Sequence, residues 1–121
     1  MIKLIDDQQA RVVKHLDDTG QRERTIIVFT SDHEETFGDH GLIQKGCRFY
    51  VGLLRVPLIF NCPGQIQEGL VNDALVELTD KAPTFLDLFG IDVPDRMQGK
   101  SLRSILEGNS NVSCHSDFVR S

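Results

Sequence analysis

The fold class is decided by the stretch Thr25-Ile26-Ile27-Val28-Phe29-Thr30, which runs directly into Ser31-Asp32-His33-Glu34-Glu35. The first part is β-branched and apolar without alternating polar residues, which is typical of a strand covered on both faces. The second part is polar and rich in carboxylates. Because ligands gather outside the carboxyl ends of strands in open α/β sheets, this junction is both a fold signal and a candidate site.

A second strand is predicted after a long loop. Residues 31–49 are polar, contain glycine and lack periodicity, which indicates a loop rather than a packed element. The apolar run Val56-Pro57-Leu58-Ile59-Phe60-Asn61 follows, and Cys62-Pro63-Gly64 closes it with a turn. Pro57 must lie at the start of this strand or at an edge, because it cannot donate a ladder hydrogen bond. We expect both strands to be of the parallel type.

Helices are predicted on both sides of these strands. An amphipathic first helix, with one face packed on a sheet, is indicated by apolar residues at near-helical spacing before Thr19-Gly20: Ile2, Ile5, Val12, Val13 and Leu16. Asp80 is placed to cap a short helix that ends at Gly90, and Ser101 to cap another that ends at Gly108. The pattern predicts an α/β architecture, yet two strands fall short of a doubly wound sheet, so the chain either has unrecognised strands or is part of something larger.

Composition excludes several classes of function. The 121 residues carry 13 Lys and Arg against 18 Asp and Glu, a formal net charge of −5, which argues against a nonspecific nucleic-acid binder. The apolar runs are far shorter than the roughly 18 residues of a membrane span. Nothing at the N-terminus has the pattern of a secretory signal, and localisation stays unassigned. One domain is expected, with about two-thirds of the unfolded surface buried.

The loop after the first strand concentrates titratable side chains. These are Asp32, His33, Glu34, Glu35, Asp39, His40 and Lys45. This density suits a hard or borderline divalent cation and metal-assisted chemistry at an anion, although a solvated surface loop is an equally good interpretation. Gly99-Lys100-Ser101 lacks the earlier glycine and the preceding strand of a phosphate-binding loop. His15 and His115 are isolated and are expected to be surface histidines.

A series of short motifs runs through the chain in order: Thr30-Ser31-Asp32-His33, Gly38-Asp39-His40-Gly41-Leu42, Lys45-Gly46, Arg55-Val56-Pro57-Leu58-Ile59-Phe60, Cys62-Pro63-Gly64, Thr79-Asp80-Lys81-Ala82-Pro83-Thr84, Met97-Gln98-Gly99-Lys100-Ser101-Leu102 and Asp117-Phe118-Val119-Arg120. Their order and spacing resemble the sulfatase family of the alkaline phosphatase superfamily. The resemblance implies an α/β fold, a partial alkaline-phosphatase-like sheet flanked by helices. It makes residues 1–121 a partial sulfatase domain, with the metal-binding strand and loop and then the start of the C-terminal region.

The resemblance also implies roles for three residues. In this family the aspartate and the following Asn or His at this strand end bind a divalent metal, usually Ca²⁺, which assigns Asp32 and His33 as metal ligands. It assigns Lys45 to the sulfate group, as a substrate-binding and catalytic residue. Cation and ammonium would neutralise charge on the sulfate oxygens and the leaving oxygen. His40 is expected to shape its loop.

Two parts of the family pattern do not occur in this sequence. Sulfatases carry a formylglycine made from a C-x-P-S-R or S-x-P-S-R motif, and a further pair of aspartate metal ligands near the N-terminus; neither is found here. The chain therefore resembles a C-terminal part of an arylsulfatase-like sulfuric ester hydrolase for small-molecule or carbohydrate sulfate esters, and we expect it to be inactive in isolation.

Two alternatives remain open. One is a phosphoester or phosphonate-ester hydrolase of the same superfamily, because a tetrahedral anion is handled similarly. The other is a noncatalytic, truncated remnant that folds weakly and self-associates through unpaired sheet edges.

Overall fold

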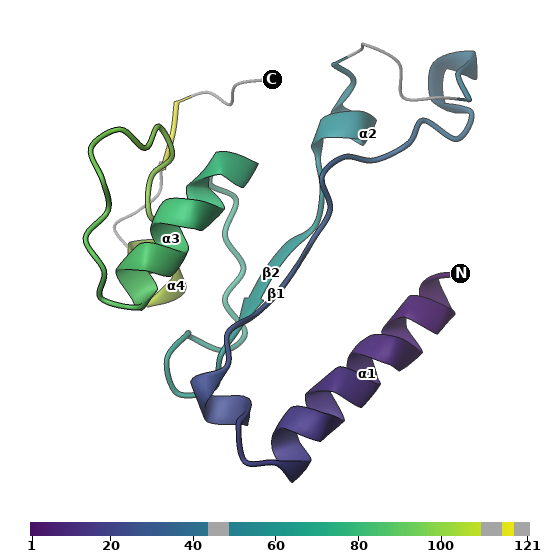
Figure 1. Ribbon diagram of the computed structural model, residues 1–121. Helices are drawn as coiled ribbons and strands as arrows, with labels where there is room; N and C mark the ends of the chain where they lie inside the picture. The colour runs from purple at the N-terminus through teal and green to yellow at the C-terminus, as the bar shows by residue number, and fades with distance from the viewer. Residues whose placement is uncertain (44–48, 110–114, 118–121) are drawn as a thin grey trace.

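The computed structural model describes residues 1–43, 49–109 and 115–117. Along them run α1 (Ile2–Asp18), η1 (Arg22–Arg24), β1 (Ile27–Thr30), η2 (Asp39–Gly41), α2 (Val51–Leu54), β2 (Leu58–Asn61), η3 (Leu78–Asp80), α3 (Lys81–Leu88) and α4 (Arg103–Leu106), where η marks a 3₁₀ turn. The strands lie between α1 on one side and α3 with α4 on the other (Figure 1). This arrangement is a partial α/β fold.

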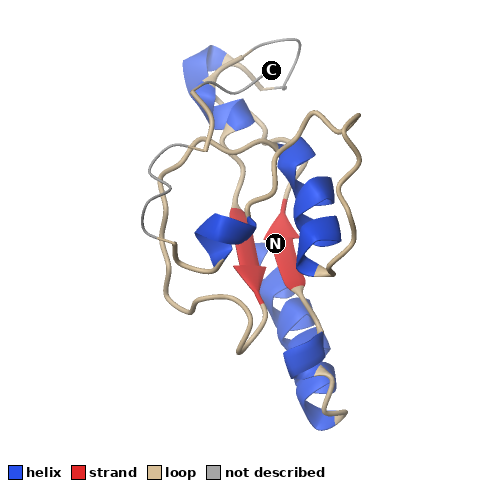
Figure 2. Ribbon diagram, turned by 90° about the vertical axis from the view of Figure 1, so that its left-hand side faces the viewer, coloured by secondary structure: helices blue, strands red, loops and turns tan. Residues whose placement is uncertain are grey.

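The two strands form an antiparallel pair, in which Ile27 lies opposite Asn61 and Thr30 opposite Leu58 (Figure 2). The prediction of parallel-type strands is therefore wrong. A parallel connection needs a crossover of a dozen or more residues, usually a helix. Of residues 31–57, the described part holds only the short η2 and α2, and the chain turns back beside β1. Pro57 directly precedes β2, as predicted.

The sheet is covered on one face only. Phe60 of β2 meets Phe85 of α3, with ring centroids 6.3 Å apart, and this contact joins the sheet to α3. Phe29 and Ile59 are register partners that point to the opposite face, and they are 37% and 56% exposed. Strand β1 is thus not fully covered on both faces, contrary to the prediction, because the side chains on that second face keep more than a third of their surface exposed.

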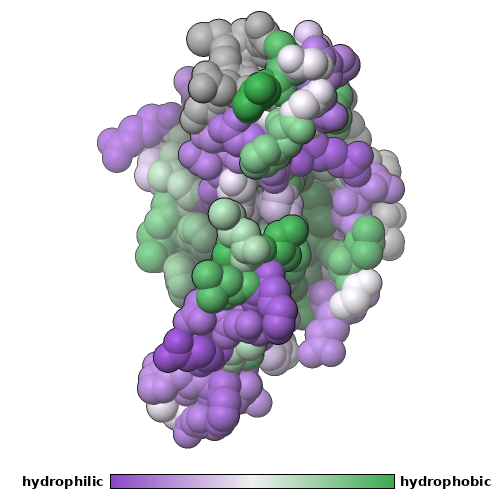
Figure 3. Space-filling view, turned by 90° about the vertical axis from the view of Figure 1, so that its right-hand side faces the viewer, coloured by the Kyte–Doolittle hydropathy of each residue, from purple (hydrophilic) through white to green (hydrophobic). Residues whose placement is uncertain are grey.

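Helix α1 has the predicted extent but not the predicted packing. Its C-cap is Thr19, whose hydroxyl donates to the His15 carbonyl at 2.7 Å. No residue of α1 is buried, and Ile2 and Val12 are 86% and 60% exposed. Figure 3 shows apolar side chains interspersed among hydrophilic ones on this side of the molecule.

The core is consequently smaller than its predicted size. The chain exposes 9228 Å², against about 6,600 Å² for a compact monomer of this length, so roughly half rather than two-thirds of the unfolded surface is buried. The difference arises because α1 has no buried residue and one sheet face is left partly exposed. None of the described helices is long and apolar enough to cross a membrane.

Buried residues concentrate in the C-terminal half. Thr84, Asp80, Pro83 and Cys62 are the largest fully buried side chains, and Leu102 and Ile105 are also buried. Helix α3 begins directly after Asp80, as predicted, and Gly90 follows its end with a positive φ of 69°. Helix α4 is shorter than predicted, but the Ser101 hydroxyl accepts from the Arg103 amide at 3.2 Å at its start.

Candidate functional site

Asp32 and His33 lie where sequence reasoning places the site, directly after β1. The Asp32 Oδ2 and His33 Nε2 atoms are 3.5 Å apart, and these side chains are 84% and 39% exposed. The Asp32 Oδ1 also accepts the His33 backbone amide at 3.0 Å. Adjacent residues thereby direct one carboxylate oxygen and one imidazole nitrogen to the same point.

The orientation of the His33 ring is set by its other nitrogen. His33 Nδ1 is 3.0 Å from the Glu34 carbonyl oxygen, and a carbonyl only accepts, so Nδ1 carries the proton. In the neutral ring, Nε2 then presents its lone pair toward the Asp32 carboxylate. One carboxylate oxygen and one imidazole nitrogen that face one another at 3.5 Å offer two electron-pair donors to a single cation.

This arrangement fits part of a metal site. Two ligands at about 2.3–2.5 Å from an ion and at right angles to one another lie about 3.3–3.5 Å apart, which matches the Asp32–His33 separation. A carbonyl that holds the second nitrogen of a ligating histidine is a common supporting contact. Within the described ranges, no group of three or more His, Cys, Asp or Glu side chains is placed to hold a metal. The chain therefore brings together two candidate ligands.

The loop that carries the pair is held by a hydrogen bond within it and by one to α2. The Ser31 hydroxyl donates to the His33 carbonyl at 2.8 Å. The Glu34 amide donates to the carbonyl of Leu53, a residue of α2 that is only 4% exposed. The position of the pair thus depends on α2 as well as on the end of β1.

Two predicted features extend beyond the described residues. Lys45, predicted to hold the sulfate group, lies outside the ranges that the structure describes, as does Phe118-Val119-Arg120 of the last motif. His40, predicted to shape its loop, has a φ of 54° in η2 and stacks on Tyr50 with ring centroids 4.2 Å apart. The sequence contains no periodic signal that would have indicated this stack.

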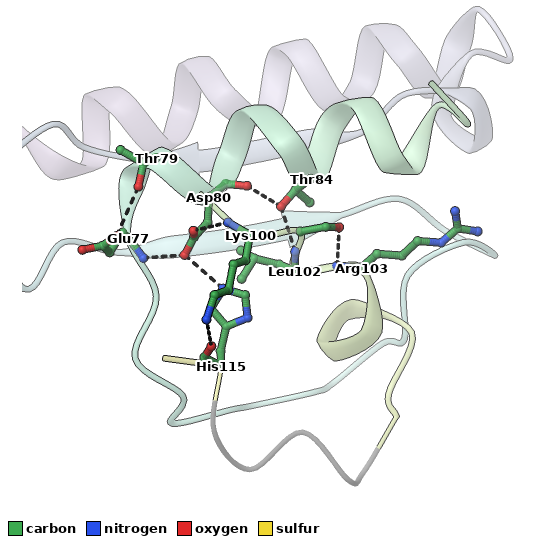
Figure 4. Close-up of polar contacts among 9 residues, drawn as sticks. Glu77, Thr79, Asp80, Thr84, Lys100, Leu102, Arg103 and His115 are labelled. Atoms are coloured by element: carbon green, nitrogen blue, oxygen red, sulfur yellow. Dashed lines mark hydrogen bonds and ion pairs between the residues drawn. The ribbon is translucent and has the colours of Figure 1, made fainter. Parts of the chain in front are cut away.

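Sequence reasoning missed a buried polar cluster around Asp80 (Figure 4). Asp80 Oδ1 accepts the Lys100 amide at 2.8 Å, and Oδ2 accepts the Glu77 amide at 2.9 Å and His115 Nε2 at 3.1 Å. The side chains of Asp80 and His115 are 3% and 5% exposed. The prediction that His115 is a surface histidine is therefore wrong. His115 is 35 positions from Asp80, and this separation hides the pairing from any local pattern.

Thr84 extends this cluster into α3 and α4. Its hydroxyl donates to the Asp80 carbonyl at 2.5 Å and accepts the Leu102 amide at 2.9 Å. A Cβ on Gly99 would lie 2.3 Å from the Thr79 carbonyl oxygen, so only glycine lets the two segments approach so closely. The Asp80 carboxylate is fully engaged in joining three segments, which gives it a structural role.

The comparisons with known proteins agree on one family. The family model "N-sulphoglucosamine sulphohydrolase, C-terminal" matches residues 38–119. The N-acetylglucosamine-6-O-sulfatase of Bacteroides thetaiotaomicron is 40% identical over 109 residues, which cover 89% of this chain and 19% of that protein.

Solved structures agree with the sequence relatives. The structure of BT4656 in complex with its substrate D-glucosamine-2-N,6-O-disulfate matches with a TM-score of 0.82 and 37% identity, over 98% of this chain and 23% of that one. The phosphonate monoester hydrolase of Silicibacter pomeroyi matches with a TM-score of 0.80 and 37% identity, over 95% and 22%.

Fold and strand-end loop together define a protein of the alkaline phosphatase-like class. Within it, the chain belongs to the sulfatase family and corresponds to a C-terminal part of the sulfatase domain. The predicted resemblance and fold class are thereby confirmed. The chain spans about a fifth of the length of the curated relatives that it matches.

Proposed function

We propose that this chain supplies the metal- and sulfate-binding edge of a sulfuric ester hydrolase. The observation that carries the proposal is the convergence of Asp32 Oδ2 and His33 Nε2 at 3.5 Å, with His33 Nδ1 held by the Glu34 carbonyl. Membership of the sulfatase family supports it.

The roles follow from the chemistry of each group. When bound, a divalent cation, Ca²⁺ by the family resemblance, withdraws negative charge from a sulfate oxygen. Asp32 supplies an anionic oxygen ligand, and His33 supplies a neutral nitrogen whose ring is oriented by Glu34. Lys45 supplies an ammonium to the sulfate group, where it neutralises charge that develops on the leaving oxygen.

For the substrate, we propose a sulfate ester of a carbohydrate. The names of two similar proteins support this class: one is an N-acetylglucosamine-6-O-sulfatase, and the other was solved with D-glucosamine-2-N,6-O-disulfate. Because this chain carries neither formylglycine motif, turnover by the chain alone is not expected, and binding is the property to measure.

A phosphonate ester is the second candidate substrate, because the phosphonate monoester hydrolase of Silicibacter pomeroyi is 37% identical to this chain. Titration of the Ca²⁺-loaded chain with inorganic sulfate and with methylphosphonate separates the two. A sulfuric ester hydrolase predicts tighter binding of sulfate than of methylphosphonate. Preference for methylphosphonate would instead assign the site to phosphonate esters.

Calcium binding is the first test of the site. Ca²⁺ at about 100 times its dissociation constant should stabilise the wild-type chain by about 2.7 kcal/mol and raise its melting temperature by about 10 °C. Asp32→Ala should abolish the shift, because it removes the anionic ligand. Asp39→Asn removes one carboxylate charge from the same loop and serves as the matched control, so it should retain the shift. An unchanged shift in Asp32→Ala would refute the assignment.

A further inference from the structure

The loop that begins at Asp32 and His33 ends in an exposed stack of two aromatic rings. His40 and Tyr50 lie with ring centroids 4.2 Å apart and ring planes inclined by 19°. Tyr50 is 38% exposed and His40 is also exposed. Each ring uses one face for the other ring, and the pair is not buried under any described element. Exposed aromatic surface that is held in a fixed geometry is typical of binding sites.

Backbone strain in this loop also indicates a binding site. His40 and Phe37 have positive φ values of 54° and 40°, in a region that glycine occupies at lower cost. Burial of the side chains does not offset the conformational free-energy cost of these positive φ values, because Phe37 is 85% exposed and His40 is exposed. Non-glycine residues that keep such conformations cluster at ligand-binding sites.

Backbone hydrogen bonds hold the strained loop in place. The Gly38 amide donates to the Leu42 carbonyl at 2.7 Å, and the Asp39 amide donates to the Thr36 carbonyl at 2.8 Å. Thr36 is only 4% exposed, so the loop is anchored on a buried residue. The imidazole of His40 is therefore presented to Tyr50 by a closed turn, and a ligand that meets the stack need not order it first.

We propose that the His40–Tyr50 stack is a platform for a pyranose ring, the sugar part of the substrate. The proposal rests on the proposed function, because it places the sugar next to the loop that carries Asp32 and His33. An aromatic face is negative, so it attracts the polarised C–H groups of a sugar ring and repels a sulfate group. The stack would hold the sugar ring, and the sulfate group would point away from the aromatic faces.

Tyrosine suits this role for two further reasons. It presents a large, rigid surface with only two side-chain torsions, so little conformational entropy is lost on contact. Its hydroxyl can donate to and accept from the hydroxyls of a sugar. A hydrophobic ring with one polar group is the usual composition of a small-molecule site.

Tyr50 makes the proposal directly measurable, because it is the single tyrosine of a chain that has no tryptophan. Intrinsic emission therefore reports on this platform alone. Titration with N-acetylglucosamine, without metal or sulfate, should change the emission saturably with a dissociation constant of about millimolar order. Sorbitol, a polyol without a ring face, should leave the emission unchanged. No response to the sugar, or an equal response to sorbitol, would overturn the platform.

His40→Gly tests the stack itself. Glycine favours the positive φ at this position, so the variant should fold while it loses the ring contact. The affinity for N-acetylglucosamine should fall about three- to tenfold. Val51→Ala is the matched control, because Val51 is 72% exposed next to Tyr50 and is not aromatic, and it should bind like the wild type. Wild-type affinity in His40→Gly would refute a role for the stack.

The two proposals can fail separately. His40→Gly should retain the Ca²⁺-dependent rise in melting temperature, and Asp32→Ala should retain the response of Tyr50 emission to unsulfated sugar. A calcium shift without a sugar response refutes the platform alone. A sugar response without a calcium shift refutes the metal assignment and leaves the platform intact.

Discussion

The two halves of this chain differ in how they are held together. In the C-terminal half, Asp80, Thr84 and Leu102 are 2%, 0% and 3% exposed, and hydrogen bonds link η3, α3 and α4. In the N-terminal half, α1 has no buried residue and one face of the β1–β2 pair is exposed. Buried hydrogen bonds between segments 18 to 35 positions apart thus hold the first region together, whereas the second has no comparable buried cluster among the described residues.

This difference has a consequence for the candidate site. Asp32 and His33 belong to the less packed half, where the Glu34–Leu53 backbone hydrogen bond joins their loop to α2. We therefore expect substitutions around Asp80 to lower the free energy of unfolding. Substitutions at Asp32 should instead weaken the binding of Ca²⁺.

The largest loss of stability is expected from Asp80→Ala. This change leaves the Glu77 and Lys100 amides and the His115 ring without their acceptor in a buried site. Loss of one partner of such a cluster costs about 4 kcal/mol. Urea denaturation followed by circular dichroism measures the change, and if it exceeds the stability of the wild type, the variant is unfolded without urea. The exposed Asp92→Ala is the control, and an equal loss in both variants would contradict the difference between the halves.

A pair of leucine truncations tests the comparison directly. Leu102 is 3% exposed and Leu4 on α1 is 63% exposed. Leu102→Ala should cost about 3 kcal/mol, because it removes a buried side chain and leaves a cavity. Leu4→Ala should change the unfolding free energy by less than about 0.5 kcal/mol. A large cost for Leu4→Ala in the isolated chain would show that α1 is packed in solution, by self-association or otherwise, and sedimentation as a function of concentration would identify which.

A smaller effect is expected from Thr84→Val, which keeps the shape of the side chain and removes its hydroxyl. The Leu102 amide, which donates to Thr84 Oγ1 at 2.9 Å, is then buried without that acceptor. One such unsatisfied group costs about 2 kcal/mol. Hydrogen exchange at the Leu102 amide should accelerate along with the loss of stability. Unchanged exchange at this amide would contradict the assigned hydrogen bond.

Local signals in the sequence predicted the elements well. The extent of α1, the start of α3 after Asp80 and the strand ends before Ser31 and Cys62 each have a recognisable cap, turn residue or apolar run. Strand direction was not predictable in this way, because an apolar run looks the same in a parallel and in an antiparallel pair. The lack of cover on α1 was equally hidden, since amphipathicity indicates a face but not its partner.

The candidate site likewise contains features that local sequence predicts and features that it does not. Asp32 and His33 are adjacent in sequence, so a motif could find both, and the strand end placed them correctly. The Asp80–His115 pair and the His40–Tyr50 stack join residues 35 and ten positions apart, across segments without a regular period. Such contacts depend on the path of the chain between them, and no local pattern of residue types encodes that path.

The smallest effect is a pH dependence from Asp87, which links α3 to α4. Asp87 Oδ2 accepts the Ser101 hydroxyl at 2.5 Å and Oδ1 accepts Arg103 Nη1 at 3.1 Å. The hydrogen bond from Ser101, followed by that from Arg103, lowers the pKa of Asp87 below its ordinary value of 3.8. The folded state therefore favours the ionised carboxylate more than the unfolded state does.

The sign of this dependence follows from the lowered pKa. The contribution of Asp87 to stability is complete above pH 3.8 and is lost as the pH falls through its lower pKa in the folded state. Asp87→Asn should remove this part of the acid destabilisation, and Ser101→Ala should reduce it, because Ser101 is the main cause of the shift. Urea midpoints between pH 6 and pH 2.5 measure the effect, with the exposed Asp95→Asn as control. Asp87 is one-third exposed, so solvent weakens its contribution to the free energy of unfolding. If the pH profile of Asp87→Asn equals that of the wild type, Asp87 does not contribute, and the buried cluster alone links α3 and α4.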